Sequence, residues 1–336
     1  MNSCCSLSFC DHHAILRVKR ARSIQTKPAR ANEGMIRRME FCKKSCCRTS
    51  CRTQELYVLA HASILVKAVP YANNRGVKIH YEVEGDGVPL VLLHGLSETH
   101  EIWRISSYVE SLKKEYGLIL VDARGHGDSD KPHDSEAYTM KLMVSDVVGV
   151  LDDLKVSKAH FLGYSMGGWI GFGIAKYSPQ RFHSLIIGGM HPYSRPNQPW
   201  IKFLTVYRST FSSDSVDTDA KLALVEEWLG PTAAKMPEWR AYAQRVLAAN
   251  DWEAFIALVS RDWGRGFDDV LPIMSMPVLL FVGETDPFYP DVRECARSIP
   301  NATFISYPGL GHAELEVRKD LVLPHIIDFL KKVIQP

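Results

Sequence analysis

Cysteine is nearly absent from the sequence beyond residue 51. Seven of the eight cysteines lie in the first 51 residues, and only Cys295 follows. A small secreted domain held together by disulfides spreads its cysteine pairs through the fold, so this organisation is excluded for most of the chain. The cysteines between Cys42 and Cys51 have no His or Cys pair at the spacing of a zinc finger. We therefore expect no metal.

Long apolar runs and glycine-rich phosphate loops are also absent. No run of 18 or more apolar residues occurs, so we expect no integral membrane segment. The chain contains neither Gly-x-Gly-x-x-Gly nor Gly-x4-Gly-Lys-Ser/Thr, the patterns with which nucleotide sites hold phosphate. We therefore expect no nucleotide cofactor, and no cofactor of another kind is indicated. No pattern in the chain sets an oligomeric state.

Most of the chain also lacks an excess of positive charge. Residues 1–54 contain 12 Lys and Arg against 3 Asp and Glu, which leaves 28 basic and 35 acidic residues for the rest. A nucleic-acid surface needs a concentrated basic face that displaces counterions from phosphate. The acidic balance of the later part therefore argues against a nucleic-acid partner.

The first 62 residues differ from the remainder in composition. They are rich in Arg and Cys and poor in acidic residues, and no clean apolar stretch follows Met1. This composition resembles an organellar transit peptide more than a secretory signal. Alternatively, translation starts at Met35 or Met39, and the basic run 43–52 with the apolar run 56–69 imitates a signal sequence. We predict that 1–62 is a disordered or cleaved extension and that the protein is cytoplasmic, or organellar or secreted if the extension is a targeting segment.

From about residue 63, strand and helix patterns alternate. Turn residues at 73–76 join two strands in a hairpin, and short apolar strands then alternate with helical periodicity. Short buried strands separated by helices indicate crossover connections and a mostly parallel sheet. The predicted strands after the turn are 77–83, 90–93, 117–121, 159–162, 184–187, 278–282 and 303–307. The predicted helices are 139–154, one after Ser165, 290–299, and a last one in which Pro324 fits only if it lies in the first turn.

Residues 191–271 contain no strand-like run. Tryptophans at 200, 228, 239, 252 and 263 are spread through segments with helical periodicity, and the segment is too long and too regular for a bare loop. We predict a helical cap at 191–271, inserted into an α/β core formed by 63–190 and 272–336. Most of the cap aromatics are expected to form the core of the cap, and some to face a ligand at the sheet edge.

A candidate nucleophile lies in the sequence Gly163-Tyr164-Ser165-Met166-Gly167, between a predicted strand and a predicted helix. In such a Gly-x-Ser-x-Gly turn the serine adopts strained backbone angles, and the residues two before and two after it have no room for a Cβ. The pattern predicts that Ser165 projects from the end of the sheet as a nucleophile.

A serine nucleophile requires a base and an acid that orients the base. In this architecture the chain order is Ser, acid, His. His312 in a glycine-flanked loop is favoured over His325, which lies in the apolar terminal helix. Asp286 follows a buried strand and is favoured over Glu284, although Asp286 is also suited to capping a helix that begins near Pro287.

Attack on a carbonyl creates an oxyanion that requires donors aimed at it in advance. We expect one donor in the backbone N–H of Met166, at the start of a helix, and a second in the N–H of Leu96, after the predicted strand 90–93. His94 is expected to be structural. Trp103, Trp169 and His191 are candidates for the substrate pocket.

The motifs "VLLHG", "VDARGHGDSD", "LGYSMGG", "VGETDPF" and "GLGH", in this order and spacing, resemble the α/β-hydrolase superfamily. The chain from about residue 63 is most similar to its capped serine esterases, enol-lactonases and cofactor-free perhydrolases. The resemblance implies an eight-stranded, mostly parallel sheet with helices on both faces and a cap after strand six. It also implies a triad of Ser165, Asp286 and His312, no cofactor, and a structural role for Asp122 and Arg124.

These features favour a serine hydrolase that cleaves carboxylic esters of short to medium acyl or aryl groups through an acyl-enzyme. The partner would be a small-molecule ester. A lactonase, a carbon–carbon bond hydrolase or a perhydrolase would use the same three residues. Dehalogenases and epoxide hydrolases of the superfamily have an aspartate where this chain has Ser165. An alternative of another class is a small-molecule receptor with a vestigial site.

Overall fold

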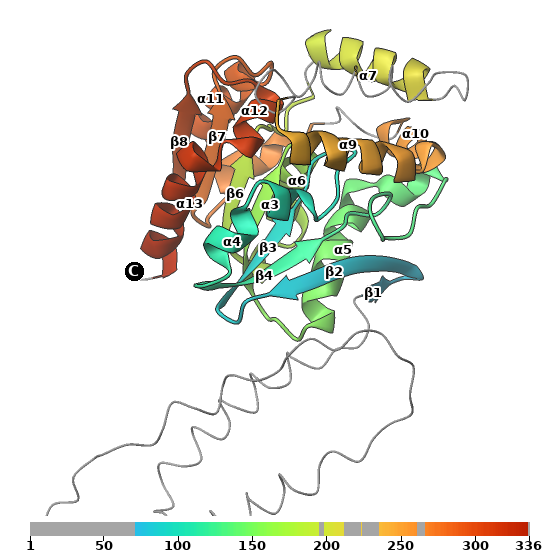
Figure 1. Cartoon of the computed structure of the whole chain (residues 1–336). Coiled ribbons are helices and arrows are strands. Elements are labelled where there is room, and N and C mark those ends of the chain that lie inside the picture. Colours follow the sequence, from blue (N-terminus) through green and yellow to red (C-terminus); the bar gives the residue numbers. More distant parts are fainter. Residues whose placement is uncertain (1–70, 195–197, 212–222, 224–234, 261–265, 335–336) are drawn as a thin grey trace, which may run out of the picture. The chain divides into compact units, whose positions relative to one another are not determined.

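The computed structural model describes residues 71–194, 198–211, 223, 235–260 and 266–334. Its centre is an eight-stranded sheet in the order β1-β2-β4-β3-β5-β6-β7-β8, shown in Figure 1. The strands are β1 (Tyr71–Asn74), β2 (Val77–Glu84), β3 (Val88–Leu93), β4 (Tyr116–Val121), β5 (Ala159–Tyr164), β6 (Phe182–Gly188), β7 (Val278–Gly283) and β8 (Ala302–Tyr307). β2 pairs antiparallel with β1 and with β4, and the other neighbours are parallel. The predicted mostly parallel α/β sheet is confirmed.

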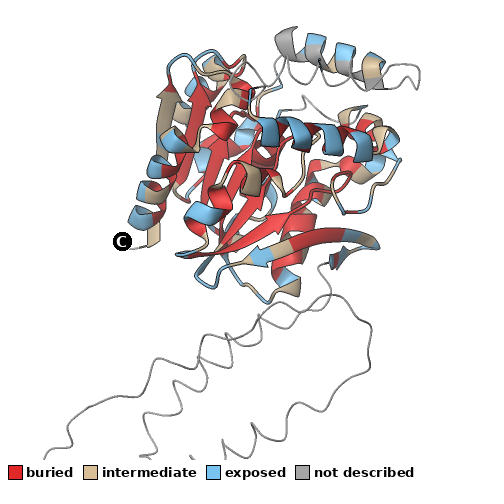
Figure 2. Cartoon of the chain, viewed as in Figure 1, coloured by how far each residue is buried: buried red, intermediate tan, exposed pale blue. Residues whose placement is uncertain are grey.

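Two apolar cores lie on the two faces of this sheet. In β3, Val91 and Leu93 belong to one core, while Leu90 and Leu92 belong to the other. This alternation follows from the period of two in a strand. All four side chains are buried because helices cover both faces, and Figure 2 shows that buried residues fill the central strands.

The helices divide between the two faces. α5 (Met140–Asp153), α6 (Met166–Tyr177) and α11 (Tyr289–Ser298) contribute buried side chains to the core that contains Val91. The short α3 (Ile102–Ile105) and α4 (Tyr108–Leu112), together with α12 (His312–Val317) and α13 (Lys319–Ile334), contribute to the opposite core. This arrangement places helices on both sides of the sheet, as the sequence predicted.

The regular elements that the structure describes between β6 and β7 are all helical. They are α7 (Gln198–Phe211), α9 (Pro237–Ala249), α10 (Trp252–Ser260) and a 3-10 turn, η3 (Asp268–Ile273). In α9, Trp239 and Tyr242 are buried and their rings meet edge to face at 5.7 Å. The cap boundaries 191–271 stay a prediction, as do the core boundaries 63–190 and 272–336, because several of these residues lie outside the described ranges.

The last helix differs from the prediction. Pro324 was expected only in the first turn, but α13 begins at Lys319 and Pro324 is an interior residue. A proline there removes one helical N–H, which costs about 3 kcal/mol in an exposed helix. The buried side chains Val322, Leu323 and Ile326 pack on the core on both sides of the proline. Tertiary packing therefore outweighs the local preference.

Residues 1–70 lie outside the described part, so the predicted extension 1–62 and its alternatives stay predictions. Among the residues that the structure does describe, none of the helices combines the length and the apolar character needed to cross a membrane.

Candidate active site

Ser165 lies in the tight turn between β5 and α6. Its backbone angles are φ 51° and ψ −113°, a conformation that a residue with a side chain rarely adopts. A Cβ on Gly163 would lie 2.4 Å from the backbone of Gly167, and a Cβ on Gly167 would lie 2.1 Å from the carbonyl oxygen of Leu93. Both glycines are therefore required for the turn to pack between β5 and β3.

The side chains of Ser165, His312 and Asp286 form one hydrogen-bonded chain. Nε2 of His312 lies 2.9 Å from Oγ of Ser165, and Nδ1 of His312 lies 2.7 Å from Oδ2 of Asp286. All three residues are buried, with Ser165 8% exposed, His312 7% and Asp286 3%. In the tautomer with hydrogen on Nδ1, the imidazole donates to the carboxylate and its Nε2 accepts the serine proton.

Asp286 makes one contact to the imidazole and one to its own turn. It does not cap the following helix, because the N-cap of α11 is Phe288 and no side chain caps that helix. While Oδ2 meets His312, Oδ1 accepts the backbone N–H of Phe288 at 2.8 Å. The turn after β7 thus fixes the carboxylate from one side and leaves the other oxygen for the imidazole. Glu284 is exposed, and its Oε1 accepts a hydrogen bond from Ser306 at 2.8 Å.

His312 was predicted in a loop but is the first residue of the short helix α12, with Gly311 as its N-cap. Six residues with one glycine beside them give too weak a periodicity to indicate a helix from sequence. The hydroxyl of Tyr164, the residue before the nucleophile, donates to the carbonyl oxygen of His312. The ring of Phe288 contacts the imidazole with its centroid 5.4 Å away. The imidazole is therefore fixed by β5 and by the turn after β7.

The loop after β3 lies directly beside the nucleophile. A Cβ on Gly95 would be 3.5 Å from Cβ of Ser165. Of the backbone N–H groups in this loop, those of Gly95 and Ser97 each donate to a side chain, whereas that of Leu96 has no acceptor among the described residues. Met166 is the first residue of α6, where N–H groups have no partner within the helix. The predicted donors thus belong to the loop beside Ser165 and to the residue that follows Ser165.

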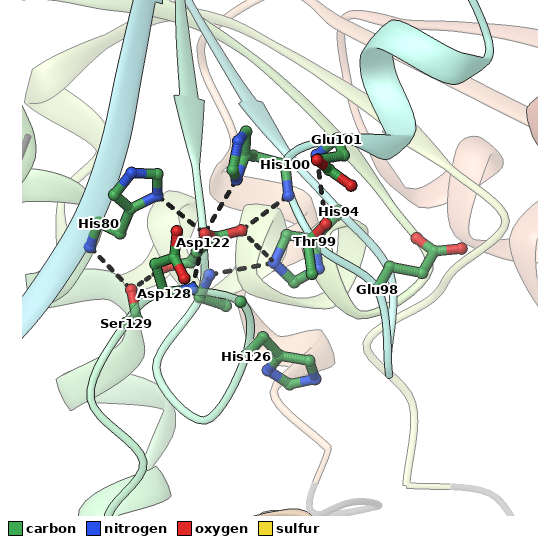
Figure 3. Close-up of polar contacts among 12 residues, drawn as sticks. His80, His94, Glu98, Thr99, His100, Glu101, Asp122, His126, Asp128 and Ser129 are labelled. Carbon is green, nitrogen blue, oxygen red and sulfur yellow. Dashed lines mark hydrogen bonds and ion pairs between the residues drawn. The ribbon is translucent and has the colours of Figure 1, made fainter. Parts of the chain in front are cut away.

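A buried carboxylate, Asp122, fixes this loop through hydrogen bonds, as Figure 3 shows. Its Oδ1 accepts the backbone N–H of His100 at 2.7 Å, and its Oδ2 lies 2.9 Å from Nδ1 of both His80 and His100. Burial alone would raise the pKa of Asp122, but the hydrogen bonds from His100 and His80 hold it well below its ordinary value. Asp122 therefore remains ionised and structural.

The contacts of His94 also indicate a structural role. Its Nδ1 lies 2.7 Å from the carbonyl oxygen of Gly95, and its Nε2 accepts the N–H of Ala123 at 3.1 Å. Burial lowers its pKa, which keeps the imidazole neutral. Arg124 pairs with Asp146 of α5 through a buried ion pair, with Nη2 and Oδ1 2.6 Å apart. The loop after β4 is thereby joined to the loop after β3 and to α5.

His80, His100 and Asp122 are also the one group of metal-type ligands that lie together in the described part of the chain. Their ligand atoms are within 4.8 Å of one another. Both imidazole Nδ1 atoms are hydrogen-bonded to the Asp122 carboxylate, so the cluster is satisfied without an ion.

The three predicted pocket residues have different surroundings. The Trp169 ring, on α6, meets Phe267 at 5.9 Å. The His191 ring lies 5.5 Å from Phe288, whose ring also contacts the imidazole of the candidate base. Trp103, on α3, is 1% exposed and packs edge to face on Tyr108 in the core. Trp103 and Trp169 are thus both buried members of the apolar cores, and His191 shares its ring contact with the residue that contacts the candidate base.

Two acidic side chains near the site were missed from the sequence. Glu98 accepts the N–H of Gly95 at 2.7 Å, and Glu316, buried on α12, is hydrogen-bonded to Glu98. A lone glutamate in a loop and another in a short helix give no periodic signal. The Glu98 carboxylate points away from the Asp122 network in Figure 3.

The chain is similar to several known hydrolases. Epoxide hydrolase 3 of Siraitia grosvenorii is 33% identical over 143 residues, which cover 42% of this chain and 44% of that protein, so the match spans less than half of the relative. Pimeloyl-(acyl-carrier protein) methyl ester esterase of Vibrio parahaemolyticus is 26% identical, covering 75% of this chain and 97% of that protein. The solved structure of Est816, described as an N-acyl homoserine lactone degrading enzyme, superposes with a TM-score of 0.62 at 27% identity, covering 77% of this chain and all of that one.

The family defined by the alpha/beta hydrolase fold matches residues 88–318, which is more than half of the chain. The strand order, the strained serine turn and this match all agree, and the chain belongs to the α/β-hydrolase family.

Proposed function

We propose that this α/β hydrolase cleaves carboxylic esters, of short to medium acyl or aryl groups, through an acyl-enzyme formed on Ser165. The hydrogen-bonded chain from Ser165 through His312 to Asp286 is the observation that supports this proposal. A serine hydroxyl is a weak nucleophile, and a neutral imidazole within 2.9 Å supplies the base it requires.

In the proposed reaction, Oγ of Ser165 attacks the ester carbonyl carbon while Nε2 of His312 takes the hydroxyl proton. The tetrahedral intermediate collapses, the bond to the alkoxy oxygen breaks, and the leaving alcohol takes the proton from His312. A water then attacks the acyl-enzyme and gives its proton to His312. The carboxylic acid leaves and Oγ regains a proton. Asp286 keeps the Nδ1 proton oriented and stabilises the imidazolium in both halves.

The negative oxygen of each tetrahedral intermediate would be stabilised by the N–H groups of Leu96 and Met166. Loss of one such donor in a serine hydrolase lowers kcat by about 100- to 1000-fold. The Met166 N–H is also at the amino end of α6, where the helix dipole favours negative charge.

Ser165 lies in the tight turn between β5 and α6, the elbow. A serine at the elbow favours ester hydrolysis over epoxide opening, although a relative is named an epoxide hydrolase. The epoxide hydrolases of this superfamily have an aspartate at that position. The esterase relative, matched over nearly its whole length, supports an ester as substrate. A lactone is the second candidate, because it is a cyclic ester and a structural neighbour at 27% identity is a lactone-degrading enzyme.

The test is a panel of nitrophenyl esters of increasing acyl length, assayed with the native chain and with Ser165→Ala. We expect a burst of nitrophenol with short acyl groups, and loss of at least about 10⁴-fold in kcat in the variant. Ser111→Ala, at an exposed serine whose hydroxyl bonds only a nearby carbonyl, is the matched control.

Three outcomes decide among the candidates. Turnover of simple lactones without turnover of open-chain esters would favour a lactonase over an esterase. Tight binding of an ester with neither turnover nor labelling of Ser165 by a fluorophosphonate would favour a small-molecule receptor. Equal activity of Ser165→Ala and the native chain would overturn the proposal.

A further inference from the structure

Two carboxyl groups beside the proposed site have no part in the proton transfer. Glu98 lies in the loop that contains Leu96, and Glu316 lies on α12, the helix that begins with His312. Glu316 is 3% exposed, and glutamate is almost never found so deeply buried without a partner. A role for this pair is therefore to be sought in its contacts.

The contacts join the two segments. Oε2 of Glu98 accepts the N–H of Gly95 at 2.7 Å, and the Glu98 and Glu316 side chains are hydrogen-bonded to each other. Two carboxylates have no donor between them, so this bond requires a proton on one carboxyl group. Oε1 of Glu316 is buried and receives no N–H or O–H from the described residues.

Electrostatics agree with a proton on Glu316. Burial raises its pKa well above the ordinary value, and the charge of Glu98 and the hydrogen bond to Glu98 raise it further. Burial raises the pKa of Glu98 as well, while the bonds from Glu316 and Gly95 oppose that effect. The hydrogen bond between the two carboxyl groups and the raised pKa of Glu316 therefore both place the shared proton on Glu316.

We propose that Glu98 and Glu316 are positioning residues for the ester hydrolysis proposed above, on which this inference rests. By sharing a proton they tie the loop that contains Leu96 to the helix that begins with His312. The position of Gly95 explains the consequence, since its Cα faces Cβ of Ser165 closely enough that an added Cβ would be 3.5 Å away. If the shared proton is lost, the two adjacent carboxylates repel each other. The loop that contains Leu96 then moves relative to His312.

Other titratable groups surround the pair. Tyr108 of α4, Tyr164 of β5 and Tyr242 of α9 interact electrostatically with Glu316, and His312 interacts with Glu98. Burial raises the pKa of each of these three tyrosines well above its ordinary value, so they stay neutral at moderately alkaline pH. The alkaline side of the pH profile therefore reports the carboxyl pair.

The test compares Glu316→Gln, Glu316→Ala and Glu98→Ala with the native chain in kcat, KM and pH profile on the best nitrophenyl ester. The glutamine amide donates to Glu98 as the protonated acid does and has no proton to lose. We expect Glu316→Gln to retain kcat at neutral pH and to lose the alkaline fall in kcat. Each alanine variant is expected to lower kcat on the order of 100-fold with little change in KM, because the reacting groups are misplaced after binding.

A spectroscopic measurement is independent of turnover. Infrared spectra of the native chain at neutral pH should contain a protonated-carboxyl carbonyl band that shifts in D₂O and disappears in Glu316→Gln. Absence of that band from the native chain would overturn the proposal, even if an alanine variant fails to fold. Glu238→Gln, at an exposed glutamate of α9, is the control and should change neither the band nor the profile.

The outcomes separate this inference from the proposed function. If the native chain neither hydrolyses esters nor reacts with a fluorophosphonate at Ser165, the proposed function fails, and the infrared band still decides whether the proton is shared. If Ser165 is active and folded Glu316→Ala has native kcat, KM and pH profile, the positioning role is wrong while the function stands.

Discussion

Asp286 contacts His312 with one carboxylate oxygen and the backbone of its own turn with the other. Oδ2 lies 2.7 Å from Nδ1 of the imidazole, and Oδ1 accepts the N–H of Phe288 at 2.8 Å. The carboxylate is thus oriented before any substrate binds, and both oxygens have defined tasks. Its two bonds can be separated experimentally by changing its charge while keeping its shape.

Asp286→Asn is expected to lower kcat by about 10⁴-fold and to leave thermal stability nearly unchanged. The amide oxygen can still accept the Phe288 N–H, but the amide NH₂ then faces Nδ1 and favours the tautomer with hydrogen on Nε2. That nitrogen can no longer accept the serine proton. Steady-state kinetics on a nitrophenyl ester and a thermal melt measure the two effects.

The exposed Glu284, two residues earlier, provides the control for this change. Glu284→Gln should retain full activity, because its contact is to Ser306 and not to the imidazole. Near-native activity in Asp286→Asn together with a large loss in Glu284→Gln would show that the acid has been assigned to the wrong carboxylate.

Gly167→Ala is expected to destabilise the fold and abolish activity. The added Cβ would lie 2.1 Å from the carbonyl oxygen of Leu93, so α6 would have to move away from β3. Overpacking of this kind costs about 1–3 kcal/mol or more in the free energy of unfolding. Urea unfolding and ester turnover are the measurements.

The helix α5 supplies the opposite case in Gly149, where an added Cβ would meet its nearest atom, Cβ of Asn74, at 3.6 Å. Gly149→Ala should stabilise the chain by up to about 1 kcal/mol, because alanine loses less backbone entropy in a helix. Equal effects of Gly149→Ala and Gly167→Ala on the free energy of unfolding would mean that the close approach of Gly167 to Leu93 does not exclude a larger residue at position 167.

The elbow was predictable because its constraints are local. Five consecutive residues determine whether a strand can turn sharply into a helix, and the glycines at 163 and 167 are visible without knowledge of their neighbours. The alternation of short apolar strands with helical segments likewise reflects burial on both faces, which made the parallel sheet predictable. Asp286 and His312 were selected by chain order and by their position after strands, and both features depend on topology.

Other features depend on packing between distant segments and were not predictable. Pro324 is an interior residue of α13 because flanking side chains pack on the sheet, and local preference alone opposes this. The short helices α3 and α4 contain too few turns to produce a periodicity. Glu98 and Glu316 are 218 positions apart, and each resembles an ordinary surface glutamate until the fold brings them together.

The stability of the protein is expected to fall steeply in acid because of Asp122. The folded state holds the pKa of this carboxyl well below the value of about 3.9 in an unfolded chain. Below about pH 5 the unfolded chain therefore binds more protons than the folded one, and the free energy of unfolding decreases as pH falls. The contribution of Asp122 is fully present above the unfolded pKa and is lost progressively on acidification towards the folded pKa. Urea unfolding between pH 7 and pH 3 measures this slope.

Asp122→Asn tests the origin of that slope. Its amide cannot accept from His80, His100 and the loop backbone at once, so the variant should lose about 3 kcal/mol at pH 7 and show a flatter acid dependence. Asp86→Asn, in an exposed turn, should follow the native curve at every pH. A variant at 122 that retains both the native stability and the native slope would show that other carboxyl groups govern acid unfolding. It would also mean that the loop containing Leu96 is positioned without the Asp122 network, since the same hydrogen bonds fix both.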